Sequence, residues 1–203
     1  MFAKFLTSTA VALALTVSLG VSSHAADKKA EDKAKMEAMM AKAKAAGTPG
    51  AGHEVLKPLA GNWTATSRHW MPGEKKPQDS AGTSSFTWVL DGRFLRQDFK
   101  GNWAGQPFEG LGFLGYDNVK KEYVSTWMDS MSTGIGQATG QWDAAAKTIT
   151  DQGSFSCPLT EKTMTFRAEW KFVDKDNVIY SMFMKDEAGK ETKAMEIKYK
   201  RAK

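Results

Sequence analysis

Cysteine is almost absent from this sequence, and that scarcity limits how the fold can be held together. The 203 residues include a single cysteine, Cys157, so no disulfide can form within the chain. Small scaffolds stapled by disulfides are therefore excluded. Hydrophobic residues make up 41% of the chain, charged residues 25% and aromatic residues 11%. This composition is typical of a globular protein with a buried core, and not of a disordered or collagen-like chain.

Histidine is also scarce, which removes most metal-binding and catalytic motifs. Of the three histidines, His24 lies in an apolar N-terminal segment, which leaves His53 and His69. Their spacing fits no zinc motif, and the Gly-x-Ser-x-Gly motif of hydrolases does not occur. The sequence therefore predicts no metal site and no cofactor.

One phosphate-binding motif occurs in the sequence but lacks the structural context that it needs. Gly110, Gly112 and Gly115 have the Gly-x-Gly-x-x-Gly spacing, but they are followed by Tyr116-Asp117-Asn118, which is typical of a turn. The nucleotide-binding version must open a helix. These glycines instead indicate strand bending or close packing.

The N-terminal segment, residues 1–25, is typical of a secretory signal peptide. Lys4 supplies a positive charge, Phe5 to Val21 is mainly apolar, and Ser23-His24-Ala25 resembles a cleavage site. We expect cleavage after Ala25 and a periplasmic or secreted product with no transmembrane span. The alternative is an uncleaved membrane anchor, for which the run is short and interrupted by Thr and Ser.

Residues 26–52 are expected to form a charged helix and a linker. Asp27 to Ala46 consists of Ala, Lys, Glu, Asp and Met, and Gly47 and Pro49 stop the helix. Met36, Met39, Met40 and Ala43 fall at helical spacing, so the segment is either a solvated leader or a docking stripe. The net charge of +5 comes without a basic cluster, so no nucleic-acid partner is predicted.

Residues 53–203 carry all seven Trp and all four Tyr, and they are expected to form an all-β domain. Short alternating runs are separated by Gly, Asn, Asp and Pro, and Asp91-Gly92 suits a type I′ hairpin turn. Short connectors favour an antiparallel up-and-down order, and closure into a barrel removes the exposed edges. The ten expected strands are Asn62–Trp70, Thr83–Leu90, Arg93–Phe99, Phe108–Tyr116, Glu122–Asp129, Gly134–Trp142, Thr148–Phe155, Thr163–Val173, Val178–Lys185 and Lys193–Lys200.

The segment Gly61-Asn62-Trp63 resembles the Gly-x-Trp opening of lipocalins and related calycin barrels. With Asp91-Gly92-Arg93-Phe94-Leu95, Gly112 to Asp117 and Trp127 to Ser130, the pattern is similar to an exported bacterial family catalogued as a domain of unknown function. The resemblance implies a lipocalin-like barrel without an established activity. It also implies structural roles for Gly61, Trp63 and a basic residue of the last strand, for which we take Arg201. A haem-binding relative would need an axial ligand, and the expected late strands contain no His.

Polar residues among aromatic ones are the candidate ligand-binding residues. Tyr123, Ser125, Trp127 and Asp129 share one strand face, and Arg96 shares another with Phe94 and Asp98. If these faces point inward, they line a cavity; the alternative is an internal ion pair or an outward face. The candidates are Arg96, Tyr116, Tyr123, Trp127 and Asp129.

Three functions remain open at this point. The first is binding of a small, largely apolar or amphipathic ligand inside the barrel. The second is an enzyme in the same cavity, with Asp129 or Glu169 as general acid or base and Arg96 stabilising an anion. The third is an envelope interaction protein that uses the 27–46 helix.

Overall fold

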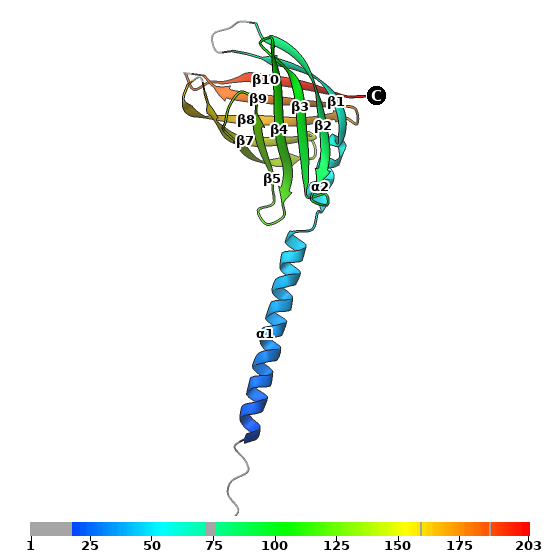
Figure 1. Cartoon of the computed structure of the whole chain (residues 1–203), viewed down its shortest axis with the longest axis vertical. Coiled ribbons are helices and arrows are strands. Elements are labelled where there is room, and N and C mark those ends of the chain that lie inside the picture. The colour runs from blue at the N-terminus through cyan, green and yellow to red at the C-terminus, as the bar shows by residue number, and fades with distance from the viewer. Residues whose placement is uncertain (1–17, 72–75, 159, 187) are drawn as a thin grey trace, which may run out of the picture. The chain divides into compact units, whose positions relative to one another are not determined.

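The computed structural model describes residues 18–71, 76–158, 160–186 and 188–203, with side chains described from residue 25 onward (Figure 1). These residues form two compact units that divide between Ala45 and Ala46. Residues 1–17 of the expected signal peptide lie outside the described residues, so export stays a prediction.

The N-terminal unit is the helix α1, Ser18–Ala46, which includes the helix expected over 27–46. Ion pairs between residues one turn apart, such as Lys35–Glu31 and Lys33–Glu37, lie along it. Every side chain described in this helix is exposed, and the three methionines are more than half exposed. No helix in the described part of the chain has the length and apolar character needed to cross a membrane.

The second unit is a closed antiparallel barrel of ten strands (Figure 1). Each strand pairs with its neighbours in the chain, and the first strand pairs with the last, which confirms the up-and-down barrel predicted from the sequence. The strands are β1 Gly61–His69, β2 Gln78–Val89, β3 Phe94–Trp103, β4 Gln106–Asp117, β5 Glu122–Asp129, β6 Gly136–Asp143, β7 Thr148–Cys157, β8 Lys162–Asp174, β9 Asn177–Lys185 and β10 Glu191–Arg201.

The turn between β2 and β3 contains the expected Asp-Gly pair at its centre. Arg93 N–H donates to Leu90 C=O (3.3 Å), which closes a turn around Asp91 and Gly92. Both central residues have positive φ (54° and 80°), as a type I′ turn requires. Leu90 is also left-handed, with φ of 50°, and the two strands therefore end one residue further from the turn than the sequence predicted.

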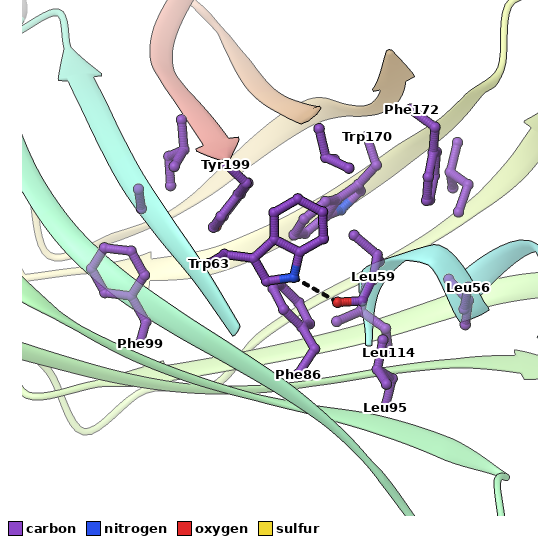
Figure 2. Packing of buried hydrophobic residues seen from close by; sticks show 14 of the residues in the cluster. Leu56, Leu59, Trp63, Phe86, Leu95, Phe99, Leu114, Trp170, Phe172 and Tyr199 are labelled. Carbon is purple, nitrogen blue, oxygen red and sulfur yellow. Dashed lines mark hydrogen bonds between the residues drawn. The ribbon is translucent and has the colours of Figure 1, made fainter. Parts of the chain in front are cut away.

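One end of the barrel is closed by two short helices, α2 Ala51–Leu56 and η1 Lys57–Leu59. Their Leu56 and Leu59 side chains are buried, and Trp63 Nε1–H donates to Leu59 C=O (2.7 Å; Figure 2). We call this end the floor. The rings of Phe86, Trp170 and Tyr199 pack edge-to-face or stacked above it.

Arg201, at the end of β10, holds the floor from outside. Its guanidinium lies over the Trp63 ring, 4.2 Å from the ring centre. It also donates to the carbonyls of Ala60 (3.0 Å) and Pro58 (2.6 Å). Gly61 has φ of +120°, and a Cβ there would lie 2.9 Å from Arg201 Nη1, so a glycine is required both by the backbone and by this contact.

Candidate functional site

The barrel interior changes along its axis from fully buried to half-buried. Inward side chains near the floor have less than 2% of their surface exposed, among them Trp63, Leu95, Ile149 and Val178. We call the opposite end, where β1, β3 and β5 finish, the mouth. Its large inward side chains are only half-buried: His69, Trp103, Phe108, Trp127, Phe155 and Phe166. Solvent therefore reaches an aromatic surface inside the mouth.

Aromatic pairs from neighbouring strands line this mouth. His69 at the end of β1 meets Trp103 at the end of β3 edge-to-face, with ring centres 4.2 Å apart. The Phe99 ring packs edge-to-face against the rings of Phe108 and Trp127, with ring centres 5.9 Å and 6.5 Å apart. Burial lowers the pKa of His69 to about 4, so this imidazole is neutral at physiological pH and is a polar but uncharged member of the lining.

Trp127 and Asp129, two of the predicted ligand-binding residues, lie together at the mouth. Trp127 Nε1–H donates to Asp129 Oδ2 (3.0 Å), and Met131 N–H donates to Oδ1 of the same carboxylate (2.9 Å). The Trp127 ring lies directly over Gly110 and Gly112, where a Cβ would come within 2.2 Å and 3.1 Å of it. The glycines of the literal nucleotide motif therefore make room for an aromatic ring of the mouth.

Tyr116 and Tyr123, two further predicted residues, lie at the floor. Tyr123 O–H donates to Gly52 C=O in α2 (3.2 Å), and burial raises the pKa of Tyr123 to about 12. The Tyr116 ring contacts the Tyr123 ring and that of His53, with centres 5.0 Å and 6.0 Å apart. The five predicted residues thus do not form one site.

Tyr116 also borders a hollow on the outside of the floor, with a volume of about 280 Å³. Its other lining residues include His53, Arg93, Phe94 and Asn118. His53 Nδ1 accepts a hydrogen bond from Gly50 N–H (3.2 Å), and burial lowers the pKa of His53. Asn118 donates to the carbonyls of Ala46 and Thr48, which anchors the linker beside this hollow.

Arg96, another of the predicted ligand-binding residues, does not face the interior. Arg96 is exposed on the outer face of β3 and pairs with Asp98 at 2.6 Å, which is the outward alternative weighed from the sequence. The buried face of β3 carries Leu95, Gln97 and Phe99 instead. Each face of this strand carries a phenylalanine, and the buried face also carries the polar Gln97. The sequence therefore did not show which face of β3 is buried.

The residues of the enzyme hypothesis are likewise dispersed. Glu169 is paired with Arg167 on the outer face of β8, and Arg167 also binds Glu191. Asp129 lies at the mouth, and Arg96 lies on the outside of β3. The structure therefore brings no carboxylate and arginine of that hypothesis together in the interior.

Two polar groups in the barrel core were missed by the sequence reasoning. Gln97 Nε2 donates to Ser84 Oγ and to Tyr199 Oη, both at 3.1 Å, so this amide is well satisfied. Asp151 on β7 is only 4% exposed, and among the described residues no hydrogen-bond donor to its carboxylate is found. Burial raises the pKa of Asp151 to about 7. The sequence did indicate that Asp151 faces inward, because alternate residues of a strand face the same side and Asp151 alternates with the apolar Ile149 and Phe155.

Asp151 borders a small internal cavity of about 10 Å³ near the floor. Leu56, Tyr123, Ser125 and Trp170 also line it, and its volume suits a single water molecule. The carboxylate lies over Gly140, where a Cβ would come within 2.1 Å of Oδ1. A glycine on β6 therefore provides the space that the acid occupies. In the described part of the chain, no cluster of three or more His, Cys, Asp or Glu side chains could hold a metal ion.

A family model described as "Protein of unknown function (DUF1579)" matches residues 48–201, which includes the whole barrel. The chain belongs to this family. Among curated proteins, none matches it.

Solved structures with a similar barrel include the following two. A protein from M. tuberculosis, Rv2717c, is 16% identical with a TM-score of 0.59; the match covers 77% of this chain and 100% of that one. The S-type phycobiliprotein lyase CPES from Guillardia theta is 14% identical with a TM-score of 0.51, covering 79% of this chain and 97% of that one. At these identities the likeness concerns the fold alone, a closed antiparallel barrel.

Proposed function

We propose that the barrel binds a small, largely apolar molecule that enters through the mouth. The observation that carries this proposal is the half-buried aromatic lining of the mouth above a fully buried floor. Ligand sites are typically concave and aromatic with a few polar groups. The mouth has this chemistry in Trp103, Phe108 and Trp127, together with the neutral His69.

The fold gives this proposal independent support. A closed barrel with a filled floor and a solvent-reached mouth offers one entrance and one axis along which a ligand can lie. One of the similar barrels is a phycobiliprotein lyase, so a barrel of this fold acts on another molecule in at least one setting. We carry over the capacity to bind, and not that protein's substrate.

A fluorescent apolar probe, N-phenylnaphthylamine, tests the proposal. Its emission should rise in a saturable way when it is added to the purified full chain. Phe108→Ala removes a ring from the mouth and should weaken the probe's affinity by about tenfold, the usual effect of losing a central aromatic contact. Phe94→Ala is the matched control, because Phe94 lies on the outer face of β3 beside the outer hollow.

The two variants separate the possible results. A loss confined to Phe108→Ala supports binding inside the barrel. A loss confined to Phe94→Ala places the probe in the outer hollow and refutes the proposal, as does an absence of saturable binding.

We also propose that the protein is exported, with the signal peptide removed after Ala25. The proposal rests on the charged, apolar and small-residue order of positions 1–25. The mass of the protein recovered from the periplasmic fraction of expressing bacteria should correspond to a chain that begins at Ala26. A full-length chain found only in the cytoplasm would refute it.

A further inference from the structure

The buried polar groups of the barrel unit have an unusual charge balance. Among the described residues, the buried side chains that are polar or charged include one acid and no lysine or arginine: His53, Ser67, Ser84, Gln97, Thr148, Asp151 and Ser181. Arg201 approaches the barrel only at the floor, where its guanidinium bonds to backbone carbonyls. A negatively charged group entering the interior would therefore meet no fixed cation.

Asp151 differs from the other inward carboxylate, Asp129. Each oxygen of Asp129 already accepts a hydrogen bond, from Trp127 Nε1 and from Met131 N–H. Asp151 is more deeply buried, and none of the described side chains or backbone amides donates to it. Among the described residues no fully buried side-chain nitrogen or oxygen lacks a hydrogen-bond partner, so the Asp151 oxygens open onto the small cavity beside them, and a donor placed in that cavity gains a hydrogen bond to them.

Beside the Asp151 carboxylate lies a cavity with room for one group the size of a water molecule. Gly140 lies beneath the carboxylate, and the cavity has a volume of about 10 Å³. Ser125 on β5 and Trp170 on β8 line the same cavity. An incoming polar head would thus meet a carboxylate, a hydroxyl and an aromatic surface.

The geometry points to a specificity for the ligand's polar end: Asp151 receives a hydrogen-bond-donating head, and a cationic amine above all, while the apolar tail lies toward the mouth. This inference rests on the proposed ligand-binding function and adds the class of ligand to it. The aromatic rings of the mouth act in the same direction, because their faces attract cations and not anions. A carboxylate head would instead be repelled by ionised Asp151.

Three amphiphiles with the same tail test the inference: octylamine, octanol and octanoate. Each displaces N-phenylnaphthylamine from the full chain at about pH 8, where the amine is protonated and Asp151 is mostly ionised. Octylamine should compete at least about tenfold better than octanoate, the gain expected for a hydrogen bond to a charged group. Octanol should lie between them.

Two variants locate the origin of that difference. Asp151→Asn removes the charge with little change of shape, so octylamine and octanoate should then differ by less than about threefold. Asp98→Asn, which removes a carboxylate from the outer face of β3, should keep the wild-type difference.

The outcomes distinguish the inference from the proposal beneath it. If the probe binds but octylamine and octanoate compete equally, or neither competes, the specificity is refuted while the binding function stands. The same holds if Asp151→Asn keeps the tenfold difference. If the probe itself does not bind, the proposed function fails first. If Asp151→Asn does not fold, the comparison of octylamine with octanoate on the wild-type protein still tests the specificity for an amine head.

Discussion

The buried carboxylate of Asp151 should give the barrel a stability that falls as pH rises. Burial raises the pKa of Asp151 from its ordinary value of 3.8 to about 7 in the folded state. Between these two values the folded state binds a proton that the unfolded state has lost, so the free energy of unfolding decreases with pH. The contribution is fully present below about pH 4 and is lost by about pH 7.

The size of this effect follows from the pKa difference. Each pH unit in that window lowers the free energy of unfolding by about 1.4 kcal/mol, and the whole window amounts to about 4 kcal/mol. Tyr180 interacts electrostatically with Asp151, and Tyr123 lines the same cavity; burial raises the pKa of both tyrosines, so both stay neutral throughout. Asp151 is therefore the group that titrates in this part of the core.

Urea unfolding of the wild type and of Asp151→Asn across this pH range measures the effect. The variant should be more stable than the wild type above about pH 7, and the difference should shrink to near zero by about pH 4. Other carboxylates titrate equally in both proteins and cancel in the difference. Asp98→Asn controls for the loss of one carboxylate and should run parallel to the wild type. Parallel curves for Asp151→Asn as well would refute the reasoning.

Further substitutions test the floor, the core and the mouth. Trp63→Phe leaves the buried Leu59 carbonyl without its donor and should lower the urea-derived free energy of unfolding by about 1–3 kcal/mol; no change would contradict the floor described above. Leu95→Ala, at a fully buried position, should cost about 2–5 kcal/mol in the same assay. Gly110→Ala should displace the Trp127 ring, seen as a shift in tryptophan emission together with altered probe affinity, whereas an unchanged spectrum would argue against that packing. Arg96→Gln, on the outer face, should change stability by less than about 1 kcal/mol and leave probe binding intact.

The strand pattern could be predicted from the sequence because turns and alternation agree along most of the chain. The strand expected over Glu122–Asp129 has those bounds in the structure, since Asp117-Asn118 marks the preceding turn and the segment is rich in aromatic and β-branched residues. β2 was predicted to begin at Thr83 but begins at Gln78. Its first residues are polar and small, so pairing with β1, and not local alternation, makes them a strand.

The facing of individual strands was harder to predict than their existence. On β3 the polar Gln97 is buried because Ser84 on the neighbouring β2 and Tyr199 on the distant β10 accept its hydrogen bonds. On β7 the acidic Asp151 is buried beside Gly140, a neighbour that only the register supplies. Gln97 is satisfied by hydrogen bonds from other strands, whereas Asp151 only gains room from Gly140, and a single-sequence pattern contains neither piece of information.

The seam of the barrel sets an order of events in time. Nine of the ten strand pairings join neighbours in the chain, but β1 pairs with β10, which places Trp63 opposite Arg201. The hairpins can therefore form between strands that are neighbours in the chain, whereas the seam needs both β1 and β10 in place. Until then β1 presents an unpaired edge to its surroundings. The pairing of β1 with β10 has the largest sequence separation in the barrel, so its closure carries the largest loop-closure entropy cost.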